Sequence, residues 1–207
     1  MQPLDQIFVV VIIIFSAVIH EVMHGVMADW LGDKTARYAG RLTLNPFVHM
    51  ELFGSVLLPA FLALTNSPFL FGWAKPVPYN PYNLKPGRFS EALVAGAGPA
   101  SNFGIALLFS ALIRADIVPS INAIFFLVVA TNIMLCIFNL IPVPPLDGSK
   151  VLSSLLPKSL QFRYDNWRSQ LERAPLAGFG LVMLFLLTIG SSFGSAVYGI
   201  ARSLAGI

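Results

Sequence analysis

Long apolar runs alternate with short polar and basic stretches along this chain. Four of the runs are long enough to be transmembrane helices, because about 20 residues cross the hydrocarbon core of a bilayer. We expect these spans at about residues 7–31, 91–113, 120–141 and 175–200. A fifth apolar run, residues 51–72, is interrupted by Pro59 and by Thr65-Asn66-Ser67-Pro68, so it is not predicted to be a continuous span.

The fifth run is instead predicted to be re-entrant, entering the membrane and returning to the same face. The 14 residues before its polar break reach only about 21 Å as a helix, whereas the hydrocarbon core is roughly 30 Å thick. With this path, 11 of the 13 Lys and Arg residues lie on one face, whereas a crossing divides them 8 to 5. Since Lys and Arg mark cytoplasmic loops, we expect that face to be cytoplasmic and the N-terminus to lie outside.

The predicted fold is therefore an all-α polytopic membrane protein with a single domain, residues 1–207. It has four full transmembrane helices, the re-entrant segment and a small β-hairpin or sheet near the cytoplasmic face. The β-structure is expected from residues 38–44, which are β-compatible, and from residues 72–79, whose two prolines favour an extended chain.

Composition supports a membrane protein and argues against nucleic-acid binding. Hydrophobic residues make up 56% of the chain and charged residues 11%, whereas soluble domains carry about 25% charged residues. The net charge of +3 comes from basic residues in the gaps between apolar runs, which indicates topology signals rather than a nucleic-acid surface. Cys136 is the only cysteine, so no intrachain disulfide is possible.

One short sequence inside the first span carries chemistry: His20-Glu21-Val22-Met23-His24. Residues four apart share one face of a helix, so both imidazoles can bind one ion, and the glutamate between them is placed to take a proton from a water on that ion. Two neutral nitrogens, one carboxylate and one water fit four-coordinate Zn²⁺. A chance match is disfavoured, because ionisable residues inside a span cost about 3 kcal/mol each and are usually functional.

Such a site needs a third protein ligand, which the motif does not identify. The candidates are the other acidic residues and the last histidine: Asp5, Asp29, Asp33, Glu51, Glu91, Asp116, Asp147, Asp165, Glu172 and His49. Asp147 stands out because it follows a proline-rich break after the third span, and non-helical backbone at membrane depth is tolerated where protein or a water-filled cavity surrounds it. An ordinary turn or N-cap aspartate stays the alternative for Asp147, and an interfacial histidine the alternative for His49.

At two distant places the chain resembles the site-2 protease family of intramembrane zinc metalloproteases. The first is the histidine motif, and the second is Asn139-x-x-Pro142-x-x-Pro145-Leu146-Asp147-Gly148. Residues 40–46, 72–78 and 97–102 look like the short bacterial and archaeal members, which lack PDZ-like and nucleotide-binding domains. The resemblance implies one zinc ion bound by His20, His24 and Asp147, with Glu21 as the catalytic acid–base.

The resemblance also implies that Asn139 and Asn102 lie near the site, as contacts to the substrate or to the developing oxyanion. The expected reaction is hydrolysis of peptide bonds within or near transmembrane segments of another protein in the lipid bilayer. Residues 38–44 and 72–79 either offer the unwound substrate a strand edge or pair only with each other, and both alternatives stay open. We expect a multi-pass protein of the plasma or inner membrane with its site towards the cytoplasm, without a nucleic-acid partner; the oligomeric state is not predicted.

Two other functions stay open on the sequence alone. An intramembrane metal-binding or metal-transport protein also places histidines and acids inside a membrane, but it does not need Glu21 between the ligands. A catalytically inactive relative acting as a scaffold is the second alternative, and the intact set of His20, Glu21, His24 and Asp147 argues against it.

Overall fold

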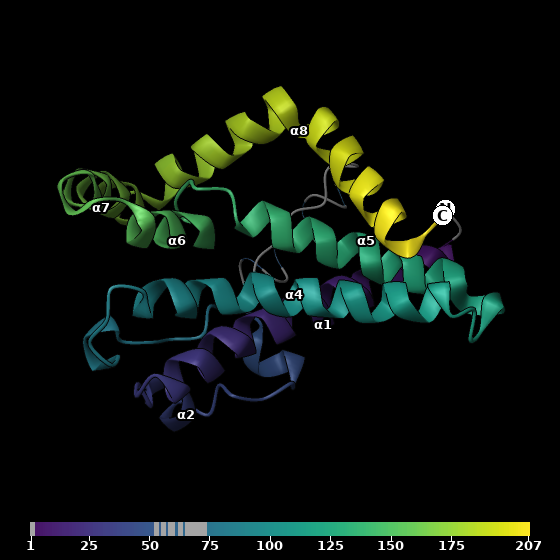
Figure 1. Cartoon of the computed structure of the whole chain (residues 1–207), viewed down its shortest axis with the longest axis horizontal. Helices are drawn as coiled ribbons and strands as arrows, with labels where there is room; N and C mark the ends of the chain where they lie inside the picture. Colours follow the sequence, from purple (N-terminus) through teal and green to yellow (C-terminus); the bar gives the residue numbers. More distant parts are fainter. Residues whose placement is uncertain (1–2, 52–53, 55–56, 58–60, 62–63, 65–73) are drawn as a thin grey trace.

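The computed structural model describes residues 3–51, 54, 57, 61, 64 and 74–207, and the elements within them are helices (Figure 1). In chain order they are α1 (Pro3–Trp30), α2 (Thr35–Tyr38), the 3₁₀ helices η1 (Pro46–His49) and η3 (Pro81–Asn83), α4 (Ser90–Arg114), the 3₁₀ helix η4 (Pro119–Ile121), α5 (Asn122–Asn139), α6 (Asp147–Leu155), α7 (Lys158–Arg173) and α8 (Pro175–Ala205).

Four of the described helices are long and apolar enough to cross a membrane: Phe8–Trp30, Ser90–Arg114, Pro119–Asn139 and Gly180–Ala205. Each overlaps one of the predicted spans, so the prediction of a helical, multi-pass membrane protein is confirmed. Local signals set the ends of the last helix. α8 begins at Pro175, where a missing N–H costs nothing, and ends before Gly206, which adopts a left-handed φ of 77°.

Helix α4 is the centre of the bundle and contacts α1, α5, α6 and α8 (Figure 1). Towards its C-terminal end, a core of small and branched residues joins α4 to α5 and α8: Ala106, Ile113, Val129, Ile133, Val197, Ala201 and Ala205. Small side chains let helices approach closely, which is how transmembrane helices gain packing contacts. The N-terminal half of α4 packs against α1 and α6 instead, and the candidate site lies there.

The end of α1 and the start of α4 lie at the same end of the bundle. Ala28 and Leu31 pack with Leu84 and Val94. The Lys85 N–H also donates to the Leu31 carbonyl over 2.7 Å. The chain between α1 and α4 therefore leaves and returns at one end, as the re-entrant prediction requires. Most of residues 51–72 lies outside the described part of the chain, so the re-entrant path itself stays a prediction.

The predicted β-hairpin is wrong for the described residues, because neither of its two stretches forms a strand there; residues 72–73 lie outside them. In the first stretch, Tyr38 ends α2 and Gly40 turns the chain with a φ of 66°. Residues 74–80 form neither helix nor strand, and their backbone donors bond to side chains and to the His49 carbonyl of η1 rather than to a partner strand. The two prolines in this stretch have no backbone N–H and cannot donate the hydrogen bonds that pair β-strands.

Candidate metal centre

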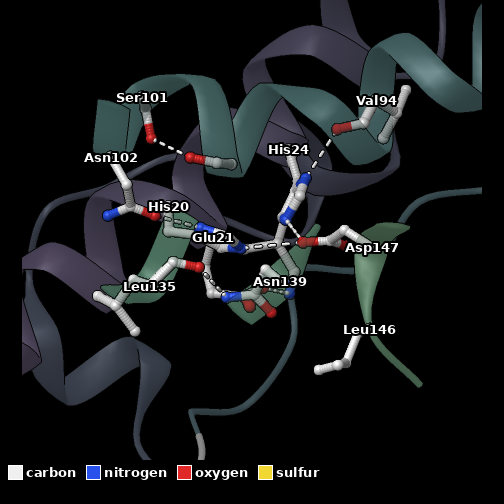
Figure 2. Close-up of polar contacts among 12 residues, drawn as sticks. His20, Glu21, His24, Val94, Ser101, Asn102, Leu135, Asn139, Leu146 and Asp147 are labelled. Atoms are coloured by element: carbon white, nitrogen blue, oxygen red, sulfur yellow. Dashed lines mark hydrogen bonds and ion pairs between the residues drawn. The ribbon is translucent and has the colours of Figure 1, made fainter. Parts of the chain in front are cut away.

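His20 and His24 of α1 meet Asp147, the first residue of α6 (Figure 2). Asp147 Oδ2 lies 3.1 Å from His20 Nε2 and 3.2 Å from His24 Nε2. The two imidazole rings stand nearly perpendicular, with centroids 4.7 Å apart. Both histidines are buried. Three potential ligand atoms thus converge from segments that are up to 127 positions apart in the chain.

Local structure explains how Asp147 reaches the histidines. α5 ends at Asn139, and the proline-rich turn that follows leads into α6. Gly148 allows α6 to start directly against the end of α5, because a Cβ at this position would collide with the Leu140 carbonyl. Asp147 is therefore held beside α1 by backbone packing one residue away from it.

The second nitrogen of each imidazole is already engaged. His20 Nδ1 donates to Asn102 Oδ1 over 2.5 Å, and His24 Nδ1 donates to the Val94 carbonyl over 2.7 Å; both acceptors belong to α4 (Figure 2). A neutral imidazole that carries its proton on Nδ1 presents a lone pair on Nε2. Both rings are therefore held in the tautomer and orientation that a metal ligand needs.

The space between the ligands matches a metal ion. A Cβ at Gly98 of α4 would lie 2.5 Å from His24 Nε2 and 2.6 Å from His20 Nε2, so the missing side chain opens the point where the ligand atoms meet. Ligand atoms around tetrahedral zinc lie about 3.4 Å apart, close to the two nitrogen–oxygen distances found here. Three protein donors of the His₂–carboxylate type leave a fourth position open, which is typical of catalytic rather than structural zinc.

Glu21 is held by the backbone of a distant segment. Its Oε2 accepts a hydrogen bond from the Val77 N–H over 2.9 Å. Within the described residues, Oε1 accepts no hydrogen bond. One carboxylate oxygen is therefore fixed, while the other is free to accept a proton.

Asn102 and Asn139, which the resemblance places near the site, have different surroundings. Asn102 is fully buried, and its Nδ2 donates to Asn132 Oδ1 over 2.8 Å and to the Ser16 carbonyl over 3.3 Å. Asn132 in turn donates to the Ser16 hydroxyl over 2.9 Å. Asn139, at the end of α5, donates to the Leu135 carbonyl of its own helix over 3.0 Å.

Most of the other candidate ligands have described partners away from this centre. Asp29 forms an ion pair with Arg37 at 2.6 Å, and Glu91 pairs with Arg168 at 3.1 Å. The remaining contacts are Asp33 with Thr35, Asp116 with Asn122, Asp165 with Ser153, Glu172 with Arg168, and His49 with the Thr43 carbonyl. Among the described side chains, Asp147 is the carboxylate that the fold brings to the two histidines.

Sequence reasoning missed several groups that build this centre. Ser16 lies one turn before the first histidine, and Asn132 lies in the middle of an apolar span. Polar residues inside a span are unusual, so the sequence could have predicted that both positions contribute to a functional site. The Val94 carbonyl and the Val77 amide are backbone groups, which every residue has, so no sequence signal distinguishes them.

Comparison with known proteins gives concordant matches. A family model described as "Peptidase family M50" matches residues 114–187. "Putative zinc metalloprotease YwhC" of Bacillus subtilis (strain 168) is 32% identical over 195 residues, covering 89% of this chain and 82% of the relative. "Putative zinc metalloprotease Rip2" of Mycolicibacterium smegmatis is 28% identical over 196 residues, covering 91% of this chain and 70% of the relative.

The protein of the same name from Mycobacterium tuberculosis (strain H37Rv) is 29% identical over 207 residues, covering 96% of this chain and 74% of the relative. No solved structure matches the chain significantly. The similarity to YwhC extends over most of both chains, and the candidate centre has the donors that zinc prefers. The chain therefore belongs to peptidase family M50, the site-2 proteases, and is an intramembrane zinc metalloprotease.

Proposed function

We propose that His20, His24 and Asp147 hold the zinc ion of this protease, and that Glu21 is the general base for attack of water on the peptide bond. The assignment rests on the convergence of two Nε2 atoms and one Oδ2 atom, while each Nδ1 is held as a donor to α4. The site lies between α1 and the start of α6, against the N-terminal half of α4, and we take the four described spans to form a single domain around it.

In this proposal, zinc, Glu21 and Asn139 each have a different role in peptide hydrolysis. Zinc bound at this site supplies Lewis acidity and lowers the pKa of a water molecule towards about 7. Glu21 accepts the proton of the attacking water on Oε1 and passes it to the leaving amine. Asn139 donates to the developing oxyanion, since its amide has two N–H groups and Leu135 occupies one.

Asn102 has a different role in this proposal from the substrate or oxyanion contact that the resemblance implies. Its oxygen accepts from His20, and its nitrogen donates to Asn132 and to the Ser16 carbonyl, so its polar atoms are used inside the bundle. It therefore orients a zinc ligand and does not contact the substrate.

The substrate is a membrane protein, and the proposed scissile bond lies within or near one of its transmembrane helices. A helix satisfies its own backbone groups, so the substrate unwinds locally before its carbonyl reaches the zinc site. In this proposal the protein is a multi-pass protein of the plasma or inner membrane and its active site faces the cytoplasm, because a re-entrant path for residues 51–72 places 11 of the 13 basic residues on the face of the site.

The central test compares the wild-type protein with Glu21→Gln on a panel of single-span substrates. Glutamine keeps the size of the side chain but is not a base, so we expect the zinc content to be unchanged and turnover to fall by about 100-fold or more. Asn139→Ala is expected to lower kcat without loss of zinc. A chelator serves as the control, and elemental analysis measures zinc.

Two outcomes contradict the assignment. Normal proteolysis by Glu21→Gln excludes Glu21 as the base, and normal turnover by Asn139→Ala excludes the oxyanion contact. The same experiment addresses the alternative of a metal-transport protein, because such a protein shows no chelator-sensitive cleavage by the wild type.

A further inference from the structure

Residues 74–80, here called the strap, run extended across α1 at the level of Glu21. Three backbone N–H groups of the strap donate hydrogen bonds to distant parts of the chain. The Lys75 N–H donates to the His49 carbonyl over 2.8 Å, the Val77 N–H donates to Glu21 Oε2 over 2.9 Å, and the Asn80 N–H donates to Asp33 Oδ2 over 2.6 Å. The Val77 hydrogen bond ends on Glu21, the proposed general base. A general base does not need a backbone donor on its carboxylate, so this bond calls for a separate explanation.

The sequence of the strap leaves a single N–H available at this point. Proline has no N–H, so Val77 carries the only backbone donor in the Pro76-Val77-Pro78 tripeptide. A residue before proline is also restricted to extended conformations, which applies to Lys75 and to Val77 itself. The two flanking prolines therefore narrow the conformations available to Val77 and leave its N–H as the one backbone donor at this point.

The side chain of Val77 fixes how closely the strap approaches α1. It is 6% exposed and lies over Gly25, one turn beyond Glu21. A Cβ at Gly25 would be only 2.8 Å from Val77 Cγ1, so the absence of a side chain there is what admits the strap. The close packing holds the N–H within hydrogen-bond distance of the carboxylate.

Arg41 completes the arrangement from the opposite side. It is buried at 7% exposure, and its Nη2 donates to the Lys75 carbonyl over 2.7 Å and to the Pro76 carbonyl over 3.3 Å. The Pro76 carbonyl and the Val77 N–H belong to one peptide unit. That peptide unit therefore lies between a guanidinium on its oxygen and a carboxylate on its N–H, and charge on both sides of one peptide strengthens both hydrogen bonds.

We propose that the Pro76–Val77 peptide, polarised by Arg41, is a positioning group for Glu21. The Val77 N–H holds Oε2 in place, so that Oε1 faces the attacking water in the orientation that proton transfer needs. The inference rests on the proposed role of Glu21 as the base. The backbone N–H groups of residues 75, 77 and 80 already donate hydrogen bonds within the chain. A substrate strand that paired with the strap would therefore receive no hydrogen bond from these three positions.

The sharpest test replaces the Val77 amide by an ester, using the α-hydroxy acid analogue of valine introduced by nonsense suppression. The ester removes the N–H and keeps the side chain. We expect kcat to fall on the order of 10-fold or more, with little change in KM and with unchanged zinc content and zinc affinity. Val77→Pro removes the same N–H genetically. The matched control is valine itself, introduced at position 77 by the same nonsense suppression, which keeps both the N–H and the side chain and is expected to show wild-type kcat.

Arg41 gives an independent arm of the same experiment. Arg41→Gln removes the charge on the peptide and is expected to lower kcat in the same way, whereas Arg41→Lys keeps the charge and restores part of the activity. An ester variant with wild-type kcat and full zinc overturns the inference. A fall in kcat that comes with loss of zinc also overturns it, because the strap then supports only the fold.

Glu21→Gln separates this inference from the proposed function. If Glu21→Gln keeps wild-type turnover, Glu21 is not the base and both proposals fail. If Glu21→Gln is inactive while the ester variant is fully active, the proposed function stands and only the positioning role is lost.

Discussion

At the scale of single residues, the centre depends as much on a missing side chain as on the ligands. Gly98 faces both Nε2 atoms, and any Cβ at this position enters the space that a metal ion needs. The same helix carries Gly104, whose Cβ would meet nothing within 4 Å. Two glycines of α4, six positions apart, therefore differ in what they do for the protein.

This difference predicts the effect of two alanine substitutions. Gly98→Ala is expected to weaken zinc binding by at least about 10-fold, because its methyl group displaces the ligand nitrogens. Gly104→Ala, the matched control, is expected to bind zinc like the wild type. Competition with a chromophoric chelator measures both affinities. Full-affinity zinc binding by Gly98→Ala would show that the ion does not sit between the two histidines and α4.

At the scale of elements, a buried polar network connects three transmembrane helices at the metal centre. Ser16 of α1, Asn102 of α4 and Asn132 of α5 hydrogen-bond to one another, and they are 5%, 0% and 0% exposed. Polar groups buried among apolar helices are costly unless they are satisfied, so the network also specifies how the helices pack. Its contact with the metal centre is the bond from His20 Nδ1 to Asn102 Oδ1.

The network predicts graded effects on zinc affinity. Asn102→Leu removes the acceptor of His20 and is expected to weaken zinc binding by about 10- to 100-fold. Asn102→Asp keeps an oxygen acceptor and is expected to retain most of the affinity. Asn132→Leu removes a similar buried amide that does not touch His20, so it is expected to cost less. Equal losses in the two leucine variants would indicate that the network only supports packing.

At the scale of the whole molecule, one end of the bundle gathers the parts that the site requires. The end of α1, the start of α4, the end of α5 and helix α6 meet there (Figure 1). The far end is closed by the apolar core of α4, α5 and α8. The chain between α1 and α4 begins and ends at the site's end, which is compatible with the predicted re-entrant segment; the path of that segment stays a prediction.

Cysteine accessibility in membranes tests this topology. Thr35→Cys and Leu70→Cys, each in a Cys136→Ser background, are expected to react with a membrane-impermeant reagent from the same, cytoplasmic face. Ala115→Cys, in the connection between α4 and α5, is the control and is expected to react only from the other face. Labelling of positions 35 and 70 from opposite faces would mean that residues 51–72 cross the membrane.

The sequence by itself determined the membrane spans and the pairing of the two proposed histidine ligands. Apolar length requires a segment to be buried in lipid whatever it packs against, so the four helices followed from composition along the chain. The helical repeat places residues four apart on one face, so His20 and His24 were paired before any tertiary contact was known. Strand formation did not follow, since residues 74–80 use their donors on other elements of the fold.

The family resemblance pointed to Asp147, but only the tertiary structure showed that its carboxylate lies beside the two histidines and what holds these rings in place. Asp147 is 127 positions from His20, so its approach depends on how α6 packs against α4 and on the close contact of Gly148 with the end of α5. Other parts of the site are backbone groups or empty space, and their roles depend on contacts with residues distant in the chain. These are the Val94 carbonyl, the Val77 amide and the space at Gly98. Local patterns reflect interactions over a few residues, whereas a metal centre depends on distances that helix packing sets.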